Sequence, residues 1–207
     1  MALFQLPVAI QSHVFKSGET AIYYPRIVGL PDRQAEERMN RAINQTVLSL
    51  QQEQLNTLPG APEQMTGHFE IKTNERGILS ILFTNYAYAP HMAHGNTVAK
   101  SLTFDTRTGA IDTLASLFQP NANYVAKLSA IVAEQIKRRE IPLLNGFQHI
   151  SPQQPFYLAD KSLVLYYPLY ELSPYYVGFP MFPIPVYDIL DIAAEQGPLD
   201  RLAADIA

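Results

Sequence analysis

The polar and apolar positions of the first eighty residues predict a hairpin, a long helix and a further hairpin. Residues 8–16 and 20–24 read as two strands around the turn-forming segment Lys-Ser-Gly-Glu. Pro31 and Asp32 suit the start of a helix. Beyond them, apolar residues recur at helical spacing at Ala35, Met39, Ile43, Val47 and Leu50. This stripe predicts a helix of about five to six turns that packs on a sheet. Two alternating strands follow around the Asn-Glu-Arg-Gly turn, with apolar positions at Phe69, Ile71, Leu79, Ile81 and Phe83.

The second half of the chain repeats the mixture of hairpins and helix. Residues 97–111 predict a strand and a hairpin turn, and residues 112–118 predict a short helix. Residues 121–140 predict a second long helix, with one face formed by Tyr124, Leu128, Ile131, Val132 and Gln135. Residues 156–168 read as a strong hairpin, and residues 181–190 read as a final strand that runs into a short helix.

These elements predict an α+β fold with a mainly antiparallel sheet and two long amphipathic helices packed on it, because hairpins replace a strict alternation of strand and helix. Residues 1–95 form the N-terminal half, with a hairpin, a helix and a hairpin. Residues 96–207 form the C-terminal half, with a strand, a helix, a hairpin, a corner rich in tyrosine and proline, and a last strand and helix. We expect the halves to share one continuous core.

Composition narrows the classes of function. The chain has 207 residues, which is enough to bury a core, and a net charge of −4, which lacks the basic footprint of a nucleic-acid partner. It has no cysteine, so disulfides, thiolate nucleophiles and cysteine-based metal sites are excluded. Phosphate-binding glycine loops and the Gly-x-Ser-x-Gly motif do not occur. We therefore predict no cofactor.

The N-terminal segment bears on the compartment. It lacks a basic region, and Gln5, Pro7 and Gln11 interrupt its apolar run, so it does not resemble an export signal. No stretch approaches the roughly 20 apolar residues of a membrane helix. The expectation is a cytoplasmic protein with no membrane span, or an extracellular one if the sequence is a piece of a longer chain. The oligomeric state is left open.

The histidines offer one candidate metal site. His91 and His94 lie three residues apart, and a carboxylate such as Asp105 would have to join them. We favour histidines that hydrogen-bond the backbone of a loop around Gly95 and Asn96, and we predict no metal.

Glu171 is the carboxylate whose setting is unusual, because it is isolated among aromatic and apolar residues. Burial there would raise the pKa of its carboxyl group and suit a proton donor. The alternative is a carboxylate that accepts hydrogen bonds from backbone N–H groups or tyrosine hydroxyls. No second catalytic group is visible beside it, so we predict no catalytic residue.

Tyrosines provide the remaining signal. Residues 168–180, Pro-Leu-Tyr-Glu-Leu-Ser-Pro-Tyr-Tyr-Val-Gly-Phe-Pro, read as a corner whose path is fixed by three prolines and whose bend is permitted by Gly178. Outward tyrosines of this corner would suit a binding face, because tyrosine joins an apolar ring to a polar tip. Tyr86 and Tyr88 lie two apart on a predicted strand and share a face. The candidate ligand-binding residues are Tyr86, Tyr88, His91, His94, Tyr170, Glu171, Tyr175 and Tyr176.

The hairpin at residues 156–168, Tyr170-Glu171, Pro174-Tyr175, Gly178 and Ile184-Pro185 together resemble a domain of unknown function found in RsiV-type anti-sigma factors and PdaC-type peptidoglycan deacetylases. Its signature runs from an aromatic and leucine-rich hairpin through a Tyr-Glu and Pro-Tyr stretch and a glycine to an Ile-Pro strand. Segments such as Tyr-Tyr-Pro-Arg-Ile-Val-Gly-Leu and Ala-His-Gly-Asn resemble the N-terminal half of the same domain, so the resemblance covers residues 20 to 192. The signature positions are Phe156 to Leu158, Leu163 to Tyr167, Tyr170, Glu171, Pro174, Tyr175, Gly178, Ile184 and Pro185.

The resemblance implies an α+β fold and a sensor role. In RsiV-type proteins the domain is an extracellular sensor that binds lysozyme, and in PdaC-type proteins it accompanies the catalytic domain. We therefore favour a non-enzymatic binding module whose partner is a lysozyme-like protein or a cell-wall glycan. The alternatives are a hydrolase acting on a cell-wall-derived or small substrate through Glu171 or the pair His91 and His94, and a cytosolic domain with a structural role in a larger complex.

Overall fold

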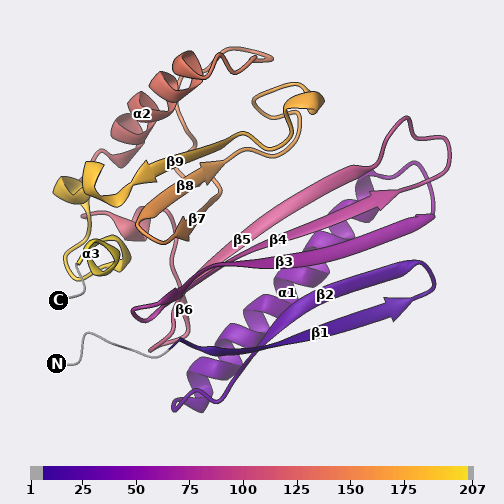
Figure 1. Ribbon diagram of the computed structural model, residues 1–207, viewed down its shortest axis with the longest axis horizontal. Coiled ribbons are helices and arrows are strands. Elements are labelled where there is room, and N and C mark those ends of the chain that lie inside the picture. The colour runs from indigo at the N-terminus through magenta and orange to yellow at the C-terminus, as the bar shows by residue number, and fades with distance from the viewer. Residues whose placement is uncertain (1–6, 205–207) are drawn as a thin grey trace. The chain divides into compact units, whose positions relative to one another are not determined.

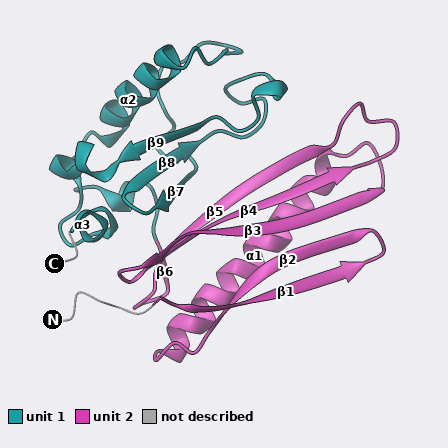
Figure 2. Ribbon diagram, in the orientation of Figure 1, with its two compact units in different colours: residues 1–4, 112–207 teal, residues 5–111 magenta. Residues whose placement is uncertain are grey.

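The computed structural model describes residues 7–204, and these divide after Ile111 into two compact units (Figure 2). We name them the N-terminal unit, up to Ile111, and the C-terminal unit, from Asp112. The sequence analysis divided the chain between residues 95 and 96. In the structure the strand that begins at Asn96 belongs to the N-terminal unit, because it pairs along its length with the preceding strand. A continuous core across both halves stays a prediction.

The N-terminal unit is a six-stranded sheet with one long helix, α1, across one face (Figure 1). The strands lie side by side in chain order, and neighbours are antiparallel except for the parallel pair β2 and β3. The elements are β1 (Ala9–Ser17), β2 (Thr20–Val28), α1 (Arg33–Thr57), β3 (Gln64–Glu75), β4 (Ile78–Tyr88), β5 (Asn96–Asp105) and β6 (Ala110–Ile111).

The parallel pair follows from the position of α1 in the chain. The helix connects β2 to β3, and a crossover of this length returns the chain to the same end of the sheet. Asp32 caps the helix by accepting hydrogen bonds from the backbone N–H groups of Gln34 and Ala35. The pairing of β2 with β3 spans only three residue pairs, the last of which joins Ile22 to Gly67.

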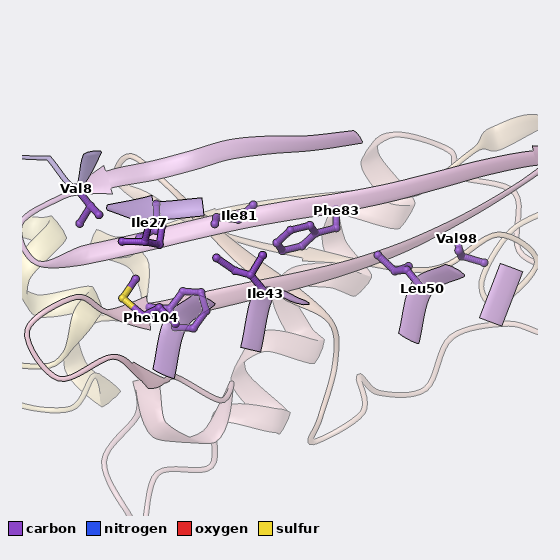
Figure 3. Close-up of a cluster of buried hydrophobic side chains, with 10 residues drawn as sticks. Val8, Ile27, Ile43, Leu50, Ile81, Phe83, Val98 and Phe104 are labelled. Atoms are coloured by element: carbon purple, nitrogen blue, oxygen red, sulfur yellow. The ribbon is translucent and has the colours of Figure 1, made fainter. Parts of the chain in front are cut away.

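The core of this unit lies between α1 and the sheet (Figure 3). The predicted helical stripe and the strand alternation meet there: Ile43 and Leu50 from α1 pack with Ile81 and Phe83 from β4. Met39, Ile43, Ile81 and Phe83 are almost completely buried. This confirms the predicted long helix and the apolar face that it covers.

Two asparagine side chains supply hydrogen bonds to backbone N–H and carbonyl groups in the region where β2 and β3 no longer pair. The backbone N–H of Ile27 donates to Asn40 Oδ1 at 2.8 Å, and Asn40 Nδ2 donates to the carbonyl oxygen of Ile27 at 2.9 Å. Asn74 makes the same pair of bonds with Val8, at 2.8 and 2.9 Å. Each carboxamide thus replaces a neighbouring strand at one residue.

The C-terminal unit contains a three-stranded antiparallel sheet and the helix α2, which runs beside β9 (Figure 1). Gln135 of α2 donates to the carbonyl oxygen of Pro183 in β9 at 2.8 Å. The elements are α2 (Tyr124–Arg138), β7 (Phe156–Ala159), β8 (Ser162–Tyr166), β9 (Met181–Pro185) and α3 (Pro198–Ala203), with single 3₁₀ turns at Ala115–Leu117, Tyr175–Val177, Val186–Asp188 and Leu190–Ile192.

The α+β class and the mainly antiparallel pairing are therefore confirmed. The two long helices pack on different sheets: α1 contacts strands of the six-stranded sheet, and α2 contacts β9 of the three-stranded sheet. The predicted hairpins before α1 and at residues 156–168 are present as β1–β2 and β7–β8.

Candidate functional site

The segment that carries four of the candidate residues is a closed loop between β8 and β9. The N–H of Tyr167 donates to the carbonyl oxygen of Pro180 at 3.1 Å and joins the two ends. The N–H of Leu144 donates to the carbonyl oxygen of Leu172 at 3.0 Å, which ties the middle of the loop to the segment after α2. Gly178 adopts a φ of 76°, as expected for its bend. We name residues 168–180 the tyrosine loop.

The tyrosine loop exposes aromatic rings. Tyr176, in the 3₁₀ turn Tyr175–Val177, is 79% exposed, and Tyr170 is 54% exposed. The rings of Tyr170 and Tyr175 are 5.6 Å apart and tilted by 30°. Tyr170 has a φ of 65°, a conformation that non-glycine residues adopt at some cost and that often marks functional loops. The loop thus presents three tyrosines on a fixed backbone.

Glu171 is an exposed residue of the same loop, and desolvation by neighbouring groups raises the pKa of its carboxyl group. The predicted direction of the shift is therefore present. Within residues 7–204 the carboxylate forms no ion pair, and it accepts no hydrogen bond. The N–H of Glu171 donates to the carbonyl oxygen of Pro168 at 3.3 Å, so the turn itself is held by backbone. No counter-charge for this carboxylate is present among residues 7–204.

Tyr167 is a buried residue that lies close enough to Glu171 to be affected by its charge. Its side chain is 5% exposed, and its hydroxyl has no hydrogen-bond partner among the described residues. Burial raises the pKa of the Tyr167 hydroxyl, and the negative charge of Glu171 raises it further. Tyr167 does not shift the pKa of Glu171 in return, because the Tyr167 hydroxyl is neutral at the pH at which Glu171 titrates.

The ring of Tyr167 is held by a series of aromatic and cation–π contacts. The ring of Tyr167 meets that of Phe182 edge to face, with 5.8 Å between centroids. The guanidinium of Arg139 lies 5.5 Å from the Phe182 ring centre and donates to the carbonyl oxygen of Met181 at 2.7 Å. Arg139, at the C-terminal end of α2, therefore holds Met181 and Phe182 of β9 in place.

The other four candidate residues lie in the N-terminal unit, at the ends of β4 and β5. The ring of Tyr86 covers Gly95: a Cβ atom on Gly95 would come within 2.2 Å of it. His94 Nδ1 lies 2.9 Å from the carbonyl oxygen of Gly95, in line with the expected loop histidine. The carbonyl oxygen of Tyr88 accepts a hydrogen bond from the N–H of Glu63 at 2.9 Å. His91 is exposed, with a φ of 70°.

The hypothetical metal site does not assemble. Asp105 pairs with Ile78 at one end of the β4–β5 ladder, whereas His94 precedes the pair of Ala87 and Asn96 at the other end. Asp105 instead binds Arg107. Across the described residues no three side chains of the metal-ligating types come together.

Several side chains with unusual surroundings escaped the sequence analysis. The sequence places Tyr167 in an apolar strand pattern, but it gives no indication that its hydroxyl lacks a partner. Asn85 is 3% exposed, and neither atom of its carboxamide has a partner within residues 7–204. Asn85 could have been singled out from the sequence, because it is a polar residue inside the apolar run of β4.

The length and polarity of the helices bear on membrane insertion. None of the helices in residues 7–204 is both long and apolar enough to traverse a bilayer. The segment that the sequence analysis examined for an export signal begins in residues 1–6, which lie outside the described residues.

A family of unknown function, DUF3298, matches residues 115–187, which include α2, the three-stranded sheet and the whole tyrosine loop. The resemblance drawn from the sequence is also confirmed by two Bacillus subtilis proteins. The anti-sigma-V factor RsiV is 25% identical over 176 residues, which cover 78% of this chain and 60% of RsiV. The peptidoglycan-N-acetylmuramic acid deacetylase PdaC is 26% identical over 125 residues, which cover 57% of this chain and 27% of PdaC. The chain thus spans less than two thirds of either relative.

Two solved structures share the fold. A DUF3298-family protein from Bacteroides fragilis superposes with a TM-score of 0.69 at 13% identity, covering 97% of this chain and 100% of the other. A DUF3298-family protein from Pseudomonas aeruginosa PAO1 superposes with a TM-score of 0.67 at 14% identity, covering 99% and 100%. Both units of this chain therefore follow a fold found in DUF3298-family proteins.

Proposed function

We propose that this protein is a non-enzymatic binding module that recognises a basic protein, such as a lysozyme, through its tyrosine loop. The observation that carries the proposal is the Glu171 carboxylate, which belongs to an exposed residue of the tyrosine loop, beside exposed tyrosines, and has no counter-charge from residues 7–204. A lysine or arginine of a partner would supply that charge. The similarity to the anti-sigma factor RsiV and the lysozyme binding that the resemblance implies suggest the same class of partner.

The shape of the loop suits a macromolecule better than a small molecule. A cleft in the N-terminal unit, lined by residues of β2, β3, β4 and α1, has room for only about one water molecule. Small-molecule sites are usually concave and enclose most of the ligand. The tyrosine loop instead carries Tyr170 and Tyr176 outward. Exposed tyrosines around one charged residue are typical of the centre of a protein interface.

The charge of the chain supports a basic partner. The net charge of −4 favours encounter with a cationic protein, although long-range attraction of this kind is screened by salt. A partner ammonium or guanidinium in contact with Glu171 and the ring of Tyr170 or Tyr175 would also gain cation–π attraction. This short-range part persists at high salt, and it distinguishes recognition from general attraction.

The raised pKa of Glu171 also favours a second hypothesis, in which the carboxyl group donates a proton in a hydrolytic reaction. Glycoside hydrolysis commonly requires a second carboxylate on the other side of the bond. Glu171 is the carboxylate of the tyrosine loop. The ionisable side chain that its charge affects is Tyr167, which is a neutral hydroxyl and not a second carboxylate. We therefore rank binding above hydrolysis.

Calorimetric titration with a c-type lysozyme, at about 0.15 M and about 0.5 M salt, tests the proposal. We expect one-to-one binding that survives the higher salt and weakens about tenfold or more in Glu171→Gln, because a charge-assisted contact is lost. Binding that disappears at the higher salt, or that is equal in wild type and Glu171→Gln, contradicts recognition through this carboxylate. Cleavage of a cell-wall polymer that is lost in Glu171→Gln would favour hydrolysis instead.

A further inference from the structure

The strand β1 forms an outer edge of the six-stranded sheet (Figure 1). Within residues 7–204 it pairs with β2 alone, in an unbroken register from Ala9 with Val28 to Ser17 with Thr20. The free side of such a strand presents a row of backbone N–H and carbonyl groups that can pair with another chain. The role of this edge is independent of the proposed function, because β1 and the tyrosine loop lie in different units.

The register shows which backbone groups of β1 face away from β2. Ser17 and Thr20 close a two-residue turn and so form a hydrogen-bonded pair, and such pairs recur at every second residue. The odd-numbered residues from 9 to 17 therefore bond to β2. Pro25 agrees with this phase, because it has no N–H and lies opposite Ser12, where none is required. The backbone groups that point outward belong to Ile10, Ser12, Val14 and Lys16.

This edge lacks the features by which proteins usually block edge pairing. The strand has nine residues, without a proline or a bulge, and its one lysine, Lys16, stands next to its last residue. Val14 and Phe15 are 43% and 50% exposed. By contrast, β5 at the other side of the sheet carries Lys100 in its middle, in an ion pair with Glu53 at 2.9 Å. The β1 edge is therefore open to a further strand.

A second copy of β1 matches the outward groups. In a dimer with two-fold symmetry, the same surface of both copies forms the contact. If two antiparallel β1 strands meet with Val14 on the axis, Val14 lies opposite Val14 of the second copy and Ser12 lies opposite Lys16. These are outward-facing residues on both strands, so each pair can exchange both backbone hydrogen bonds. No charged residue lies opposite a like charge.

The side chains favour this register over its neighbour. With Val14 on the axis, Phe15 lies opposite His13 of the second copy, and the His13 ring already lies 5.8 Å from that of Tyr24 in its own copy. Cross-strand aromatic pairs of this kind stabilise a sheet. An axis at His13 would instead set the two histidines against each other and Phe15 against Gln11. The exposed apolar residues of β1 are thus matched by its own sequence.

We propose that β1 is a homodimer interface, in which the β1 strands of two copies pair antiparallel about Val14 and join two six-stranded sheets into one. The contact consists of one strand edge from each copy, which is smaller than a standard protein interface. The dimer is therefore reversible, with monomer and dimer in exchange. The occupant of the edge is a second copy of this chain.

Sedimentation equilibrium of the full chain over a range of concentrations tests the proposal. We expect a monomer–dimer equilibrium. Val14→Glu places two carboxylates opposite each other on the axis and should weaken the dimer about tenfold. Ile71→Glu is the matched control, because Ile71 is 47% exposed on β3, away from this edge. It should dimerise like wild type.

Cross-linking tests the register and does not depend on the folding of Val14→Glu. The chain has no cysteine, so Val14→Cys carries a single thiol. Its Cα atoms would lie about 5.5 Å apart across the axis, a separation that a disulfide can span. In Ser12→Cys the two thiols would be offset by four residues, or about 14 Å, which is too far. We expect Val14→Cys to form a covalent dimer on oxidation and Ser12→Cys to remain uncross-linked.

Three results would overturn the proposal. The first is a wild-type chain that stays monomeric at every concentration, which would leave the edge to a strand of a different protein. The second is a dimer that is equally stable in wild type and Val14→Glu, because its interface would lie elsewhere. The third is cross-linking of Val14→Cys that does not exceed that of Ser12→Cys.

Discussion

The negative charge of Glu171 acts on the hydroxyl group of Tyr167, and within residues 7–204 neither group has a hydrogen-bond or ion-pair partner. Tyr167 is buried, and the charge of Glu171 adds to the effect of burial in raising the pKa of Tyr167. The pKa of Glu171 is itself raised by desolvation. Such an arrangement is a cost in the free protein, and a cationic partner would relieve it.

The first prediction concerns stability and pH. Because the folded protein binds the Glu171 proton more tightly than the unfolded chain does, stability falls as pH rises from the mildly acidic range of an ordinary glutamate through the raised pKa. Glu171→Gln removes this loss. We expect the variant to gain stability relative to wild type over that interval, measured as the free energy of unfolding in urea at a series of pH values.

Glu134→Gln, on the exposed side of α2, is the matched control for this series. The pH-dependent gain of Glu171→Gln should exceed any change with pH seen in Glu134→Gln. A Glu171→Gln variant whose relative stability does not change with pH would show that the carboxyl group titrates normally in the folded protein.

Much of the fold follows from the sequence because its elements carry periodic patterns. The stripe from Ala35 to Leu50 specifies α1, and the Asp-Lys turn at residues 160–161 specifies the β7–β8 hairpin. The parallel pairing of β2 with β3 is not written in either strand. It arises because α1 carries the chain across the sheet, and only three residue pairs form.

The candidate site was predictable in composition but not in geometry. Prolines and Gly178 indicate a corner, and the raised pKa of Glu171 could be expected from its apolar neighbours. The sequence could not reveal that Tyr86 covers Gly95 or that Asn85 lacks partners, since both depend on strand register. Distances across strands are set by pairing and not by local propensity.

A second prediction compares two glycines with the same backbone conformation. Gly109 and Gly18 have φ values of 70° and 56°. A Cβ atom on Gly109 would lie 2.6 Å from the carbonyl oxygen of Ala35, whereas one on Gly18 would meet nothing within 4 Å. Gly18→Ala should cost about 1–2 kcal/mol from backbone strain alone. Gly109→Ala should cost about 1–3 kcal/mol more, because the turn must move away from α1.

Urea unfolding of both glycine variants at one pH measures the difference. Equal losses of stability would mean that the β5–β6 turn does not press on the first turn of α1.

The third prediction concerns the clasp between Asn40 and Ile27. Asn40→Ala leaves the N–H and carbonyl groups of a fully buried residue without partners. We expect a loss of about 2–6 kcal/mol, from about 1–3 kcal/mol for each of the two unsatisfied groups. Asn44→Ala, at an exposed position one turn further along α1, should change the free energy of unfolding by less than about 0.5 kcal/mol. Similar small changes in both variants would contradict the role of the clasp.

The fourth prediction concerns the buried carboxamide of Asn85. Since it has no partner within the described residues, replacement by the similarly sized leucine should leave thermal stability unchanged or raise it. A loss of several degrees would indicate that the carboxamide stabilises the fold through bound water.

The most direct test of recognition through the tyrosine loop compares two exposed tyrosines. Tyr176 lies in the loop and is 79% exposed, and Tyr187 lies outside it and is 52% exposed. Each should tolerate alanine without unfolding. In calorimetric titrations with a c-type lysozyme at about 0.5 M salt, we expect Tyr176→Ala to weaken binding at least about tenfold and Tyr187→Ala to match wild type. Equal binding by both variants and wild type, or no binding by any of them, would contradict the proposed function.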